Sequence, residues 1–182
     1  MLHQLQGTRR LAIIGIGADL REDDVVGNLL ARELIGEIKQ SMDASHNGSY
    51  EYTDEERIQS GNLLVLNATV APELYLSLVK SFAPDRVIII DAASMGAKAK
   101  PGDLAFITPA ELDASTFSTH TISLRYFVEI LKTMGLDAEF AIIGIQPANL
   151  GYGEALSQPV EETKAFLKTL FLRYLTNKFL KA

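Results

Sequence analysis

The chain has no cysteine, no excess of positive charge and no long apolar run, and each shortage excludes a class of protein. Without cysteine there are no disulfides, no zinc–thiolate sites and no thiol nucleophiles. The longest apolar runs are shorter than a membrane span, and the N-terminus lacks the apolar core of a signal peptide. The sequence therefore predicts a cytoplasmic protein that does not insert into a membrane.

Acidic residues outnumber basic ones, 23 to 17, giving a formal net charge of −6 and an isoelectric point near 5.1. This balance argues against nucleic acid or an anionic membrane surface as the main partner. The 182 residues are enough to bury a full core, and no linker or internal repeat divides them. We therefore expect a single domain over residues 1–182.

The most informative stretch runs from Gly15 to Gly27. The branched apolar residues from Leu11 to Ile16 predict a buried strand that stops at glycine. Apolar side chains then recur every fourth residue (Val26, Leu30, Leu34 and Ile38), which is the spacing of one helix face. The sequence thus predicts a strand, a short polar loop and a helix that ends near residue 42.

Two aspartates, Asp23 and Asp24, precede this helix. Aspartate favours such positions because its carboxylate caps unpaired amides at the positive end of the helix dipole. The carboxyl end of a strand is also where open α/β sheets place their chemistry. A dinucleotide site is excluded, because Leu20 occupies the position of the third glycine and the acidic loop would repel a pyrophosphate.

The rest of the chain continues the alternation of strand and helix. Strands are expected over residues 63–66, 86–91, 102–108 and 140–145, and helices after Pro72, after His120 and from Pro159, whereas the polar residues 43–60 predict a long surface loop. No helix separates 86–91 from 102–108, which allows the strand over 102–108 to be antiparallel. The pattern predicts an α/β fold, a three-layer α/β/α sandwich with a mostly parallel twisted sheet.

Three side chains are then expected at the same edge of this sheet: Asp24, Asp91 and His120. Asp91 follows four branched apolar residues, and burying its carboxylate is costly unless it is paired or bound to a ligand. We therefore place it at the rim of the sheet, although it could instead cap the next turn. His120 precedes a helix, where a capping or surface histidine is the alternative to a functional one.

Several motifs resemble, in matching order from about Leu11 to Tyr174, those of the [NiFe]-hydrogenase maturation endopeptidases. The primary motifs are Gly15-Ile16-Gly17-x-x-Leu20-x-x-Asp23-Asp24, Ile90-Asp91-Ala92 and Ser118-Thr119-His120. Further motifs resemble the branch that processes the large subunit of formate-hydrogenlyase-type hydrogenases (hydrogenase 3): Met95-Gly96, Pro101-Gly102, Gly144-Ile145-Gln146-Pro147 and Ser157-Gln158-Pro159-Val160.

The resemblance implies an endopeptidase that removes the C-terminal extension of a hydrogenase large-subunit precursor after nickel insertion. It assigns the metal-contacting and catalytic positions to Asp24, Asp91 and His120, and implies that the precursor supplies the nickel. A carboxylate–carboxylate–imidazole set suits nickel, zinc or manganese and leaves coordination positions open. The metal could polarise the scissile carbonyl, or a carboxylate could act as general base while nickel fixes the register of the substrate. Asp23 is a second candidate for that base.

The chain departs from the usual family pattern at three positions. Ala18 stands in place of asparagine, Val25 in place of glycine, and Asn67-Ala68 in place of Asp-Gly at the end of the second strand. These departures motivate an alternative, a non-catalytic metal-sensing or scaffold protein on the same fold. A metal-dependent hydrolase of small substrates is a further alternative.

Overall fold

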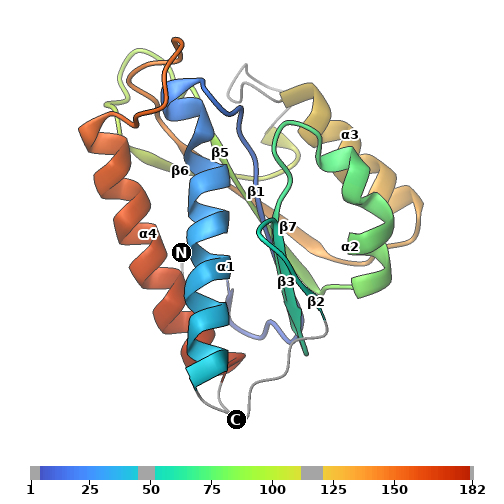
Figure 1. The fold of residues 1–182 in the computed structure, drawn as a ribbon. Helices are drawn as coiled ribbons and strands as arrows, with labels where there is room; N and C mark the ends of the chain where they lie inside the picture. Colours follow the sequence, from blue (N-terminus) through green and yellow to red (C-terminus); the bar gives the residue numbers. More distant parts are fainter. Residues whose placement is uncertain (1–4, 45–51, 112–120, 181–182) are drawn as a thin grey trace.

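The computed structural model describes residues 5–44, 52–111 and 121–180, which form a seven-stranded sheet covered by helices on both faces (Figure 1). The strands are β1 (Leu11–Gly15), β2 (Tyr52–Thr53), β3 (Arg57–Ser60), β4 (Leu63–Asn67), β5 (Arg86–Ala92), β6 (Leu104–Ile107) and β7 (Glu139–Ile145). The α-helices are α1 (Val26–Ala44), α2 (Leu76–Phe82), α3 (Thr121–Thr133) and α4 (Gln158–Lys178), and two 3₁₀ turns, η2 (Glu22–Val25) and η3 (Pro72–Tyr75), precede α1 and α2.

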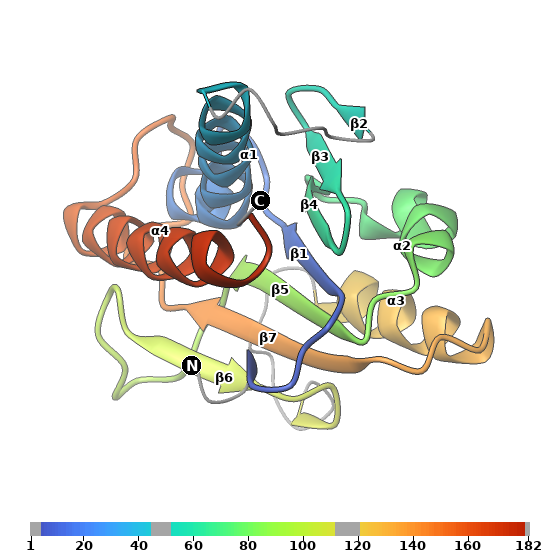
Figure 2. The same ribbon diagram turned by 90° about the horizontal axis from the view of Figure 1, so that it is seen from below.

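The sheet has the strand order β2-β3-β4-β1-β5-β7-β6. Its central strands β4, β1, β5 and β7 are parallel, and β6 pairs antiparallel with β7. Two separate apolar clusters fill the spaces on either side, one beneath α1 and α4 and one beneath α2 and α3. Viewed from below, Figure 2 shows these helix pairs on opposite faces of the sheet. The predicted three-layer α/β/α fold is confirmed, including the antiparallel strand over residues 102–108.

The loop predicted over residues 43–60 is wrong in part. Residue 43 still belongs to α1, and β2 and β3 form an antiparallel hairpin whose second strand pairs with β4. In β3 only Ile58 is buried, so the strand lacks the repeated apolar alternation that would have revealed it. Residues 45–51 of the predicted loop lie outside the described residues. The described part of the sheet therefore has three antiparallel pairings, and two strands, β3 and β6, run against the direction of the central ones.

The spacing of Leu74, Leu78 and Phe82 predicts one apolar face for the helix after Pro72, and this prediction is wrong in part, because Leu74 is 78% exposed. Residues 72–75 form the 3₁₀ turn η3, and the α-helix begins only at Leu76. The tighter turn rotates Leu74 away from the face that Val79 and Phe82 bury.

Among the described residues, no helix is both long and apolar enough to cross a membrane.

Ion pairs tie α1 to α4. The buried ammonium of Lys164 contacts the Glu33 carboxylate and lies 3.1 Å from that of Glu161, while Lys168 lies 3.1 Å from Glu33. Burial opposes ionisation of Glu33, but the hydrogen bonds from the two lysines outweigh it and hold the pKa of Glu33 below its ordinary value of 4.5. A group whose pKa is depressed by folding stabilises the protein above its ordinary pKa, and this contribution is lost as the pH falls through the folded value.

We expect Glu33→Gln to lower the free energy of unfolding at pH 7 by about 1 kcal/mol, since the carboxylate is only partly buried. The difference from wild type should shrink as the pH falls below 4.5, where the wild-type carboxylate itself becomes protonated. Chemical denaturation between pH 7 and pH 3 measures it. Glu73→Gln, at an exposed site on η3, is the control; a Glu33→Gln effect independent of pH would contradict the ion-pair explanation.

Candidate active site at the carboxyl edge of the sheet

Close backbone contacts bring the start of α1 onto the ends of β1 and β5. A Cβ atom added to Gly27 would lie 2.2 Å from the Ile16 carbonyl oxygen and 2.3 Å from that of Ile90. Any larger residue at this position would separate the helix from the strand ends. Glycine therefore allows α1 to approach the sheet and places η2, the turn just before it, against β5.

Asp24 lies in η2, and its side chain is buried. Its Oδ2 accepts a hydrogen bond of 3.2 Å from the backbone N–H of Ala18. A Cβ atom at Gly17 would lie 2.2 Å from the Asp24 carbonyl oxygen, so the loop after β1 passes directly against this turn. The local sequence thus folds the loop and the turn together and holds the carboxylate inward at the edge of the sheet.

Asp91 is the penultimate residue of β5, at the carboxyl edge of the sheet where the sequence placed it, and it is fully buried there. The strand continues through it, pairing Asp91 with Gly144 of β7. Side chains alternate along a strand, and Val87 and Ile89 belong to the cluster beneath α2 and α3. The Asp91 carboxylate therefore points to the face covered by these two helices, at the same edge as Asp24.

His120 lies outside the described residues, one position before the start of α3. Within the described ranges, no group of three or more histidine, cysteine or acidic side chains is arranged to hold a metal ion. The structure therefore brings two members of the predicted triad, Asp24 and Asp91, to one edge, and the convergence of all three stays a prediction. The two buried carboxylates are the oxygen donors of the expected set of ligands.

Asp23, the second candidate base, has a different role from its neighbour. Its buried carboxylate accepts hydrogen bonds from the backbone N–H groups of Ala148 (2.7 Å), Asn149 (3.0 Å) and Ser157 (2.7 Å), and from the Ser157 hydroxyl (2.8 Å). These four donors occupy both oxygens and fix the loop between β7 and α4. Asp23 is therefore an anchor of that loop, whereas the sequence suggested a helix cap or a base.

A polar network surrounds the end of β4. The Asn67 amide donates to the Glu56 carboxylate, whose other oxygen accepts from Arg32 at 3.0 Å. This hydrogen bond, together with the nearby Asp19 carboxylate, holds the pKa of Arg32 above its ordinary value. An aspartate at position 67 would instead face Glu56 with a second negative charge. Asn67, which departs from the family pattern, is therefore suited to its position beside the Glu56 carboxylate.

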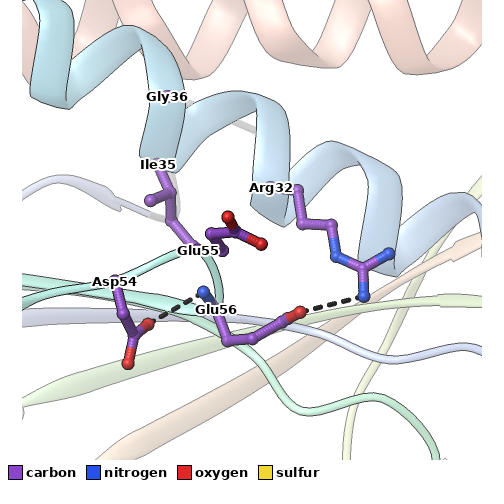
Figure 3. Close-up of a pocket in the computed structure, with 6 residues that line it drawn as sticks. All are labelled: Arg32, Ile35, Gly36, Asp54, Glu55 and Glu56. Carbon is purple, nitrogen blue, oxygen red and sulfur yellow. Dashed lines mark hydrogen bonds and ion pairs between the residues drawn. The ribbon is translucent and has the colours of Figure 1, made fainter.

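Beside this network lies a surface pocket of about 460 Å³ between α1 and the turn that joins β2 to β3 (Figure 3). It is lined by Arg32, Ile35, Gly36, Asp54, Glu55 and Glu56. The figure shows Arg32 and Glu56 reaching toward each other across the pocket. The two residues link α1 to the hairpin that the sequence did not reveal.

The other two departures also fit the backbone. Position 18 contributes its N–H group to Asp24, and any residue except proline supplies that donor. Val25 is buried in η2, and its backbone does not have the positive φ that would require glycine. Neither position therefore requires the residue that the usual family pattern places there.

Comparison with known proteins identifies related sequences. A family described as "Hydrogenase maturation protease" matches residues 50–172. A protein of Methanocaldococcus jannaschii, provisionally named a hydrogenase maturation protease, is 32% identical over 147 residues, which are 81% of this chain and 78% of the relative. The hydrogenase 3 maturation protease of Escherichia coli K12 is 31% identical over 104 residues, 56% of this chain and 64% of that protein.

Solved structures show the same fold. The crystal structure of the [NiFe] hydrogenase maturation protease HycI from Thermococcus kodakarensis superposes with a TM-score of 0.73 at 27% sequence identity, covering 94% of this chain and 96% of that one. The hydrogenase maturating endopeptidase HybD from E. coli has a TM-score of 0.66 at 20% identity, with 94% of each chain covered, and bears on the fold alone.

Proposed function

The chain belongs to the hydrogenase maturation protease family, and from this premise we propose that it is an endopeptidase acting on a [NiFe]-hydrogenase large-subunit precursor. It removes the C-terminal extension of the precursor in the cytoplasm after nickel has been inserted. The observation that carries the proposal is the placement of two buried carboxylates, Asp24 and Asp91, at one edge of the sheet by the packing of η2 against β5.

The nickel belongs to the substrate in this proposal. The precursor presents its ion to Asp24, Asp91 and His120, whose oxygen and nitrogen donors suit a divalent first-row metal. Three protein ligands from separate segments leave coordination positions for groups of the precursor. The site then recognises the nickel-loaded precursor because only the loaded form supplies the ion that the three side chains bind.

Two catalytic roles are open to the site. The ion could polarise the scissile carbonyl and lower the pKa of the attacking water, or Asp24 or Asp91 could remove a proton from that water while the ion positions the peptide. The four hydrogen bonds accepted by Asp23 support assigning the base to one of the other two carboxylates.

The test is cleavage of purified precursor with and without nickel. We expect the loaded precursor to lose its C-terminal extension and the nickel-free precursor to stay intact, because the recognition element is missing. Mass spectrometry of the shortened protein and of the released peptide identifies the bond. Enzyme first stripped with a chelator and then desalted should process the loaded precursor at the wild-type rate.

Equal processing of both precursor forms would contradict nickel recognition. Intact binding of the loaded precursor without cleavage would instead support the non-catalytic metal sensor. Hydrolysis of small peptides that lack the large-subunit fold, at the rate found for the precursor, would favour a general metal-dependent hydrolase.

A further inference from the structure

Two apolar side chains project into solvent beside Asp24. Tyr152, in the loop between β7 and α4, is 83% exposed, and Leu20, in the loop after β1, is 46% exposed. Their segments are paired by backbone hydrogen bonds: Gly153 N–H donates to the Leu20 carbonyl at 3.1 Å, and Glu22 N–H donates to the Gly153 carbonyl at 3.0 Å. Backbone hydrogen bonds therefore hold the loop after β1 beside the loop between β7 and α4, and each loop carries one of the two exposed side chains.

The backbone that carries Tyr152 is held on both sides. Gly151 N–H donates to the Glu22 carboxylate at 3.0 Å, and Gly153 is tied to Leu20 and Glu22 as described above. A Cβ atom at either glycine would come within 3.0 Å of the Glu22 side chain, so the glycines let the loop pack closely on it. The backbone at Tyr152 is thus ordered before any partner binds, which reduces the entropy lost on association.

Leu20 occupies an unfavourable backbone conformation. Its φ angle of +61° lies in the left-handed region, where a side chain costs roughly 1–2 kcal/mol that glycine does not incur. Three of the four non-glycine residues described with positive φ lie at this edge of the sheet: Leu20 and Thr69 in loops, and Glu22 at the start of η2. Strain of this kind clusters at functional sites. Because Leu20 is half exposed, little packing within the protein offsets the cost.

We propose that Leu20 and Tyr152 together form an apolar anchor that binds the folded body of the hydrogenase large-subunit precursor. The inference rests on the proposed function, which makes the precursor the protein that reaches this edge. Leu20 lies four residues before Asp24, and the N–H group of Ala18, two residues before Leu20, donates to the Asp24 carboxylate, so a protein bound on the anchor lies next to the site. An aromatic ring and an aliphatic side chain carried on a hydrogen-bonded backbone are suited to the central contacts of an interface, where a few large side chains dominate the binding energy.

The test measures kcat and KM for nickel-loaded precursor with Tyr152→Ala and Leu20→Gly. Each variant should raise KM about tenfold or more, and leave kcat at saturating precursor within about twofold, because the anchor acts in binding. Leu20→Gly should also unfold at the same temperature as wild type or a higher one, since glycine relieves the strained φ. Tyr152→Phe, which keeps the ring, should retain the wild-type KM.

Matched controls are available on other faces of the molecule. Tyr126 on α3 is 53% exposed and Phe166 on α4 is 57% exposed, so Tyr126→Ala and Phe166→Ala remove similar apolar surface from helix positions outside the two paired loops. Both controls should process the precursor with wild-type KM. An unchanged KM for Tyr152→Ala and Leu20→Gly, or an equal rise in the controls, would overturn the anchor.

Failure of the proposed function would have a separate signature. If the wild-type protein does not shorten the precursor at all, the endopeptidase proposal fails, and calorimetric titration of loaded precursor then decides the anchor alone. Weaker binding to Tyr152→Ala than to wild type and Tyr126→Ala would support it. Equal affinity for all three proteins would reject it.

Discussion

Replacing Asp91 by asparagine is expected to reduce kcat for precursor processing by about 10²–10⁴-fold, the range for loss of a catalytic acid–base group. Asparagine keeps the size of the side chain but removes the negative charge that binds a cation or accepts a proton. Asp24→Asn should have the same effect, because its carboxylate lies at the same edge of the sheet. His120→Ala should also lose processing as the predicted third ligand.

Stability separates this loss from unfolding. Both aspartates are buried, but asparagine has nearly the same shape as aspartate, so we expect either substitution to change the stability little. At position 24 the asparagine oxygen can still accept the hydrogen bond that the Ala18 N–H donates to Asp24. We expect unfolding free energies within about 1 kcal/mol of wild type. A collapse of stability in both variants would show that the carboxylates serve the fold, whereas wild-type kcat would remove them from the chemistry.

The sequence predicted most of the fold because its strongest signals are local. Apolar residues at every fourth position from Val26 to Ile38 identified α1, and the run of branched residues before Asp91 identified β5. The hairpin of β2 and β3 was missed because a short polar edge strand with one buried side chain, Ile58, has no periodic signal. Its pairing with β4 is a tertiary interaction that local propensity does not encode.

The candidate site was predictable only where strand ends define it. Asp24 and Asp91 follow predicted strands, and parallel strands bring their carboxyl ends to one edge. The depth of their burial was not predictable, since it depends on how closely Gly27 lets α1 approach the sheet. The pairing of Leu20 with Gly153 joins positions far apart in the sequence, which no local pattern reveals.

Asp23→Ala is expected to lower the free energy of unfolding by on the order of 3 kcal/mol, in contrast to the variants of its neighbour Asp24. The substitution leaves backbone donors of Ala148, Asn149 and Ser157 without their buried acceptor, and each such donor costs about 1–3 kcal/mol when it stays unpaired. Local rearrangement that lets water reach these donors keeps the total loss of stability below the sum of the three separate costs. Urea denaturation and thermal unfolding measure the loss.

Asp23→Asn provides the sharper comparison. An asparagine offers one oxygen acceptor, and its NH₂ group would face the N–H donors of the loop, so we expect it to restore little of the lost stability. Asp19→Asn, at an exposed carboxylate of the loop after β1, controls for charge removal and should unfold like wild type. Processing by Asp23→Ala should fall together with its stability, because Asp23 joins η2, which carries Asp24, to the loop that carries Tyr152. Loss of processing at wild-type stability would instead assign the Asp23 carboxylate to the chemical step.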